Sequence, residues 1–145
     1  MSTFRTSRRM PAPPAAVFAA LSHTERLARW WGPSGFTNVV DVSEFRPGGQ
    51  WVFTMIGPDG QRYANRCTFD AIEPPHRVVI RHQSAPHFTL IITLVAVGNT
   101  TDVWWEQAFD DPAVAEAVRA VCVPANEQNL DRLASELGLA GRAAV

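Results

Sequence analysis

The sequence predicts an α+β domain in which a curved antiparallel sheet of about seven strands wraps around a long C-terminal helix. Three observations carry this prediction. Short segments with alternating apolar residues fill the middle of the chain, and the few residues between them require antiparallel neighbours. An apolar stripe with helical spacing occupies the last third. Two short helical segments follow the first strand, and nothing divides residues 1–145 into more than one domain.

The N-terminal segment predicts one strand followed by two short helices. The strand is expected over Phe4–Arg9 and ends before a cluster of three prolines. Proline is tolerated in the first helical turn because its missing N–H has no partner there. The first helix is therefore expected over Ala15–Leu21. A capping box formed by Ser22 and Glu25 predicts the second helix over Thr24–Trp31, which a Gly-Pro pair ends.

Six further strands are expected, and turn-forming pairs such as Gly48-Gly49 and Gly98-Asn99 separate them. In several of these segments the large apolar residues alternate, which places them on a single face of the sheet. Trp51 and Phe53 follow this pattern on one segment. The expected strands are Thr37–Phe45, Gln50–Ile56, Arg62–Ile72, Arg77–Gln83, Phe88–Ala96 and Thr101–Phe109.

The last third predicts one amphipathic helix that begins near Pro112. Apolar residues recur at the spacing of a single helix face from Val114 to Cys122, and the stripe resumes as far as Leu137. Pro124 removes a main-chain hydrogen bond, so a kink or a break is expected near residues 122–126. A single helix cannot fill the concave side of a strongly curved sheet. The pattern therefore predicts a cavity between the helix and the sheet.

Two stretches of the sequence resemble a known family. RWWGPSGFT, from Arg29 to Thr37, and EFRPGGQWVF, from Glu44 to Phe53, are similar to the bacterial branch of the AHSA1-like family, the homologues of the activator of Hsp90 ATPase. The resemblance extends over nearly the whole chain. It implies the helix-grip (START-like, Bet v 1-like) fold of the SRPBCC superfamily, which includes polyketide cyclases. Members of that superfamily share a cavity rather than one chemistry.

The chain departs from the family pattern at two places. The family usually has an aromatic residue near the position of His82, and it usually has Gly followed by Trp near Ala125-Asn126. The first difference is expected to alter the choice of ligand. The second is expected to widen the mouth of the cavity, because a bulky indole beside Pro124 is missing.

The candidate ligand-binding residues are the aromatic and small apolar side chains expected to face the cavity, together with one histidine. Pockets for small molecules are mostly apolar and contain a few placed polar groups. Ordinary core packing is the alternative explanation for each aromatic residue. The candidates are Trp30, Trp51, Phe53, Tyr63, Cys67, Phe69, His82, Trp105, Val118, Val121 and Cys122.

Three functions follow from such a cavity. The first is the binding of a small apolar or aromatic molecule, without a cofactor. The second is an enzyme of the cyclase, dehydratase or hydrolase type, for which His82 and Glu106 are the candidate acid–base residues. The third is an Hsp90-type co-chaperone module, which the resemblance implies. Eukaryotic co-chaperones carry an additional N-terminal domain, for which this chain is expected to have no room.

The composition excludes several other classes. The net charge of −1 does not provide the basic surface that nucleic-acid binding requires, and no apolar run reaches the roughly 18 residues of a membrane span. All 13 basic residues are arginines, so a Schiff-base or P-loop lysine is absent. His76, His82 and His87 surround one hairpin, but no metal-ligand motif accompanies them, so no metal site is predicted.

The sequence also carries expectations about location and assembly. The first residues form no secretory signal, and Cys67 and Cys122 lack disulfide or redox spacing, so a cytoplasmic bacterial protein is expected. Strand alternation places Trp104 on the face opposite Trp105, beside Ala108. An apolar patch there predicts a homodimer contact.

Overall fold

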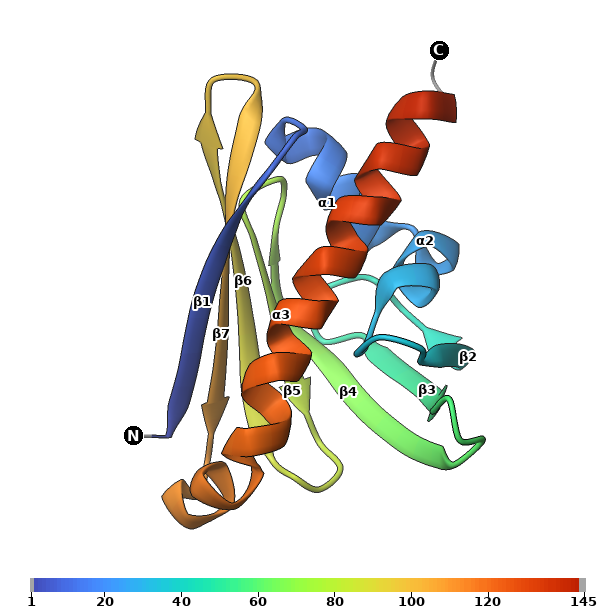
Figure 1. Cartoon of the computed structure of the whole chain (residues 1–145), viewed down its shortest axis with the longest axis vertical. Helices are drawn as coiled ribbons and strands as arrows, with labels where there is room; N and C mark the ends of the chain where they lie inside the picture. Colours follow the sequence, from blue (N-terminus) through green and yellow to red (C-terminus); the bar gives the residue numbers. More distant parts are fainter. Residues whose placement is uncertain (1, 144–145) are drawn as a thin grey trace.

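The computed structural model describes residues 2–143 and confirms the predicted architecture. Strand β1 (Thr3–Met10) is followed by the short helices α1 (Pro14–Ser22) and α2 (Thr24–Trp30). Helix α3 (Pro112–Ala143) ends the described chain and lies across one side of the sheet (Figure 1). The strands between them are β2 (Thr37–Ser43), β3 (Gln50–Ile56), β4 (Arg62–Glu73), β5 (Arg77–His82), β6 (Phe88–Val97) and β7 (Thr100–Phe109).

The seven strands form one antiparallel sheet in the order β1-β7-β6-β5-β4-β3-β2. The register shifts between Val40 and Val42 in β2 and between Phe69 and Ala71 in β4. Such irregularities bend a strand and increase its twist. Figure 1 shows the result, since β1, β7 and β6 run nearly along α3 whereas β4 slants away from behind it, with β3 farther to the side. The curvature leaves a concave side that faces α3.

The C-terminal half of α3 is anchored on the short helices. Its residues Leu130, Leu133 and Leu137 are buried in the main core. The Glu136 carboxylate is only 4% exposed and accepts hydrogen bonds from Arg26 and Arg29 of α2 at 2.8–3.0 Å. The hydrogen bond from Arg29 is the main reason that the pKa of Glu136 lies below its usual value. This half of α3 is therefore fixed to α2.

The N-terminal half of α3 packs differently. Val118 and Cys122 lie against a second apolar cluster built on Phe4 and Phe109, separate from the main core. The solvent-facing side of this half carries Val121, which is 71% exposed, and also the exposed ion pair of Arg119 with Glu116. Neither α3 nor any other helix in the described part of the chain is long and apolar enough to cross a membrane.

Two local predictions need correction. Helix α3 continues through Pro124, so the predicted break is wrong, although the first turns of α3 run in a different direction from the rest (Figure 1). Pro124 and Ala120 are exposed, so water can bind the carbonyl that proline leaves without a donor. The capping box of Ser22 and Glu25 is also absent. His23 occupies the N-cap of α2, and no side chain caps it.

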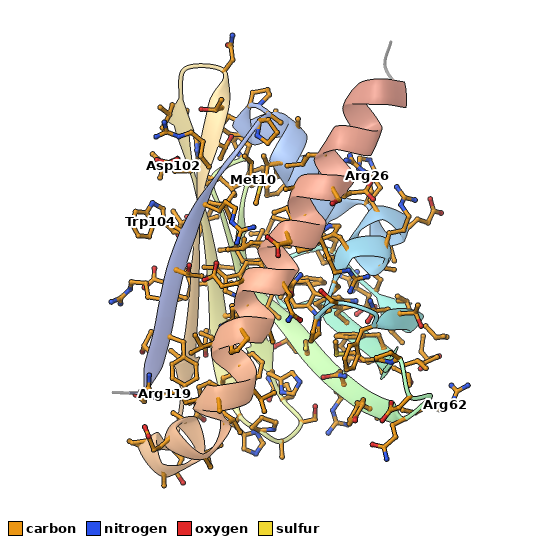
Figure 2. The ribbon with its side chains drawn as sticks, viewed as in Figure 1. Met10, Arg26, Arg62, Asp102, Trp104 and Arg119 are labelled. Carbon is orange, nitrogen blue, oxygen red and sulfur yellow. The ribbon has the colours of Figure 1, made fainter. Side chains whose placement is uncertain are left out.

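The outer face of the sheet carries Trp104, as alternation predicts. Figure 2 shows this side chain pointing away from α3, and it is 41% exposed. Two ion pairs lie on the same face, Arg5 with Glu106 and Arg9 with Asp102, each at 2.8 Å. Trp104 is therefore an exposed indole among surface ion pairs.

Candidate ligand-binding site

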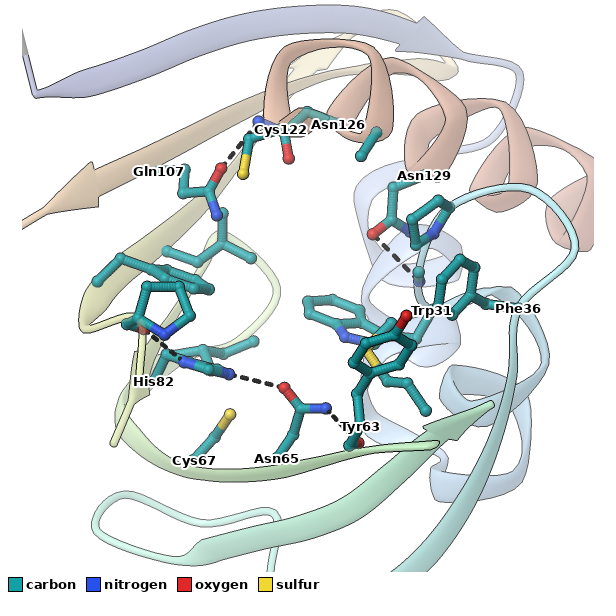
Figure 3. A pocket seen from close by; sticks show the side chains of 18 of the residues that line it. Trp31, Phe36, Tyr63, Asn65, Cys67, His82, Gln107, Cys122, Asn126 and Asn129 are labelled. Atoms are coloured by element: carbon teal, nitrogen blue, oxygen red, sulfur yellow. Dashed lines mark hydrogen bonds between the residues drawn. The ribbon is translucent and has the colours of Figure 1, made fainter. Parts of the chain in front are cut away.

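A cavity of about 390 Å³ lies between α3, the concave face of the sheet and the loop after α2 (Figure 3). Apolar side chains make up most of its wall. The sheet contributes Phe53, Met55, Ile80, Leu90 and Trp105, and the loop contributes Trp31, Pro33 and Phe36. This is the position predicted for the cavity.

Seven of the eleven candidate residues line this cavity. The two cysteines are the smallest side chains among them, and their sulfur atoms point into the cavity from β4 and from α3 (Figure 3). Val121 lies at the rim, as its high exposure shows. The seven residues are Phe53, Tyr63, Cys67, His82, Trp105, Val121 and Cys122.

The other four candidates, Trp30, Trp51, Phe69 and Val118, are not part of the lining. Trp51 is covered on its own face of the sheet, since its ring stacks on Phe53 and Phe69 at centroid distances of 4.2 and 5.6 Å. The Trp30 indole N–H donates to the Ala20 carbonyl at 2.9 Å. Alternation and helical spacing identify the face of an element but not what covers each position along it.

The wall that was missed is the loop after α2, and Arg132 of α3 holds it in place. The guanidinium donates to five main-chain carbonyls at 2.7–3.1 Å, those of Arg29, Trp31, Gly32, Pro33 and Phe36. Gly32 has a φ of +99°, which a residue with a Cβ rarely adopts. The Trp31 ring thereby packs against Trp51 and Trp105, with ring centroids 4.9 and 5.6 Å apart.

A short chain of polar side chains links β7 to α3 at the edge of the cavity (Figure 3). The Trp105 indole N–H donates to Asn126 Oδ1 at 3.2 Å, and Asn126 Nδ2 donates to Gln107 Oε1 at 3.1 Å. Gln107 is 7% exposed and lines the cavity. Neither amide is among the residues predicted from the sequence. Gln107 lies two residues after Trp105 on β7, so both side chains point to the same face of the sheet. This alternation would have identified Gln107.

Glu106, one of the two acid–base candidates, lies outside the cavity. Its carboxylate accepts a hydrogen bond from Arg5 at 2.8 Å on the outer face of the sheet. The neighbouring residues Trp105 and Gln107 point inward, so alternation directs Glu106 outward. The structure therefore offers Glu106 no acid–base role in the cavity.

His82, the other candidate, lines the cavity but is already engaged by protein groups. Its ring is 7% exposed and stacks on Phe88 at 4.5 Å. Nδ1 lies 2.7 Å from the Pro86 carbonyl and Nε2 lies 2.7 Å from Asn65 Oδ1. Burial lowers the pKa of His82 below its ordinary value. The Pro86 carbonyl and Asn65 Oδ1 are both acceptors, so the neutral ring, which has a single N–H, can donate to only one of them.

Burial of His82 is expected to make stability depend on pH. The unfolded chain binds a proton at an ordinary pKa of about 6.5, whereas the folded chain binds it only at lower pH. As the pH falls from about 7 to 5, wild type should lose unfolding free energy relative to His82→Phe, by at most about 1.4 kcal/mol per pH unit.

Urea unfolding of both proteins across this pH range measures the difference. His76→Gln, at an exposed position, is the matched control and should follow wild type. A wild-type minus His82→Phe difference that stays constant with pH would contradict the assignment.

The two cysteines act as apolar lining rather than as nucleophiles. Both are free thiols. Burial raises the pKa of Cys67 to about 12 and also raises the pKa of Cys122, so both thiols are protonated at neutral pH. In the part of the chain that the structure describes, no three His, Cys, Asp or Glu side chains converge to hold a metal ion.

Comparison with known proteins agrees with the fold. Residues 11–138 match the family model described as activator of Hsp90 ATPase homolog 1-like protein. The chain belongs to this AHSA1-like family. Among functionally curated proteins, none is similar enough in sequence to count as a match.

Solved structures of bacterial proteins share the helix-grip fold. A protein from Arthrobacter aurescens has a TM-score of 0.87 at 20% identity, covering 94% of this chain and 86% of its own. One from Chromobacterium violaceum has a TM-score of 0.82 at 25% identity, covering 93% and 96%. The AHSA1 protein from Silicibacter pomeroyi has a TM-score of 0.75 at 22% identity, covering 94% and 98%. The AHSA1-like chain therefore has the START-like fold predicted from its sequence.

Proposed function

We propose that this AHSA1-like protein binds a small, largely apolar or aromatic molecule in the cavity between α3 and the sheet. The observation that carries the proposal is a space of about 390 Å³ lined by aromatic and aliphatic side chains. No Arg, Asp or Glu belongs to its lining among the described residues. Apolar burial, worth roughly 25 cal/mol per Å² before ordering costs, would supply the binding free energy.

Titration with the neutral fluorescent probe N-phenyl-1-naphthylamine tests this function. The expected result is a saturable rise in emission with one probe per chain, because the probe leaves water for an aromatic cavity. A chain that is folded by circular dichroism but gives no saturable signal would overturn the proposal.

The same geometry supports binding more than catalysis. An acid–base role needs a titratable group free to reach the ligand. Both nitrogens of His82 already contact protein oxygens, and Glu106 faces outward. No observation favours the enzyme alternative or a co-chaperone role. Free thiols at Cys67 and Cys122 are typical of a reducing compartment, and they support a proposed cytoplasmic location.

We also propose that the face around Trp104 forms a homodimer contact. The indole is 41% exposed, and interface centres are enriched in tryptophan. Trp104→Glu is expected to raise the dimer dissociation constant by about tenfold or more, because it puts a charge in the centre of the contact. Sedimentation velocity measures this shift. Val39→Glu, at an exposed apolar position on β2, is the matched control. A wild-type monomer at high micromolar concentration would contradict the proposal.

A further inference from the structure

The hydrogen bonds around Gln107 identify the chemical class of the ligand, and this inference rests on the proposed ligand-binding function. We propose that the cavity selects neutral, apolar molecules that carry an acceptor oxygen, such as a ketone or an ester carbonyl. Gln107 is the specificity-determining residue, and it donates a hydrogen bond to that oxygen through Nε2.

The orientation of the Gln107 amide follows from its neighbours. An indole N–H can only donate, so Trp105 requires Asn126 to present Oδ1 to it. The other half of the Asn126 amide, Nδ2, then faces Gln107 and can only donate. Gln107 must accept with Oε1, which leaves Nε2 as the atom turned toward the cavity (Figure 3). The direction of this chain of bonds is thus set by the indole.

The Gln107 Nε2 atom is a donor without a protein partner. Gln107 is only 7% exposed, and no side chain or carbonyl in the described part of the chain accepts a hydrogen bond from Nε2. Nε2 faces the cavity, where water can reach it, and it is not among the fully buried atoms that lack a partner. A ligand that displaces this water without supplying an acceptor leaves the donor unpaired, which costs free energy. A ligand with an acceptor oxygen at this point should therefore bind more tightly than one with a methylene group there.

The rest of the lining argues that the acceptor is neutral. The described lining contains no arginine that could pair with an anion, and both nitrogens of His82 are held by Pro86 and Asn65. Burying a carboxylate without a counter-charge is far more costly than burying a carbonyl. The other amides, Asn65 and Asn129, already face protein partners with both ends. Among the side-chain amides of the described lining, Gln107 is the one with a donor that remains for a ligand.

Three naphthalenes of similar shape test the inference by calorimetry. They are 2-acetylnaphthalene, which has a neutral acceptor, 2-isopropylnaphthalene, which has none, and 2-naphthoate, which is an anion. Gln107→Leu keeps a side chain of similar size but has no donor. This variant should bind the ketone about tenfold more weakly than wild type does. Its affinity for the hydrocarbon should be unchanged or higher. Naphthoate should bind wild type more weakly than the ketone. Equal effects of Gln107→Leu on ketone and hydrocarbon, or tighter binding of naphthoate, would overturn the inference.

A second variant reverses the polarity without touching Gln107. In Asn126→Asp the carboxylate still accepts from Trp105 but cannot donate to Gln107, so the Gln107 amide turns over and presents Oε1 to the cavity. Ketone affinity should fall about tenfold, whereas 1-(2-naphthyl)ethanol, whose hydroxyl can donate, should keep its affinity. A merely structural role for Asn126 would weaken all ligands alike, and that result would contradict the inference.

The outcomes separate this inference from the proposed function. If none of the three naphthalenes binds folded wild type, the proposed function itself fails. If they bind but the ratio of ketone to hydrocarbon affinity is unchanged in both variants, the cavity binds ligands and the role of Gln107 is wrong. A Gln107→Leu chain that fails to fold leaves Asn126→Asp as the deciding measurement.

Discussion

Replacing Arg132 with methionine is expected to lower the free energy of unfolding by about 3–5 kcal/mol. The substitution removes the donor for five main-chain carbonyls while it keeps the apolar stem. A buried carbonyl left without a donor costs about 1–3 kcal/mol, and water can reach only some of these five. No carboxylate pairs with Arg132 among the described residues, and burial lowers the pKa of its guanidinium. Its role is therefore to order the loop.

Urea unfolding monitored by tryptophan fluorescence measures this loss, and two variants control it. Arg62→Met removes an exposed arginine with no side-chain hydrogen bond among the described residues, and it should stay within about 0.5 kcal/mol of wild type (Figure 2). The free energy of unfolding of Arg132→Lys should lie between those of Arg132→Met and Arg62→Met. A single ammonium cannot reach all the carbonyls that a planar guanidinium contacts. Equal stabilities of Arg132→Met and Arg62→Met would show that the loop does not depend on Arg132.

The fold could be predicted from sequence because its signals are local. Alternation within each strand, Gly and Pro turns between strands, and one long apolar stripe define a sheet and a helix that must pack together. A kink or a break was predicted near Pro124, and the break is wrong because proline was considered without its surroundings. Its position on the exposed side of α3 lets water satisfy the freed carbonyl.

The site could be predicted only in part, because a cavity depends on what covers each position. Parity placed Trp51 and Phe53 on the correct face, yet Phe53 and Trp31, which both line the cavity, pack on the Trp51 ring and separate it from the cavity. The search for titratable groups favoured Glu106 over Gln107, although parity with Trp105 already separated the two. Arg132 had no signal, since its partners are carbonyls about 100 positions earlier in the chain.

Cys67→Trp is expected to abolish probe binding while the chain stays folded. Cys67 is 2% exposed on β4, between Trp51 of β3 and His82 of β5 in the sheet register, and its sulfur points into the cavity (Figure 3). An indole at this position would extend into the space of about 390 Å³ and exclude a naphthyl ring. The affinity for N-phenyl-1-naphthylamine should fall by more than about tenfold.

The controls distinguish filling the cavity from damaging the fold. Val39→Trp adds the same indole at an exposed position on β2 and should bind the probe as wild type does. Overpacking costs about 1–3 kcal/mol of stability where side chains cannot shift, and this cost could destabilise Cys67→Trp. Cys122→Phe is therefore a second variant, which fills the same space from α3. Because the two cysteines point inward from opposite walls, both variants should displace the probe if it binds between them. Undiminished probe affinity in either folded variant would place the bound molecule outside this cavity.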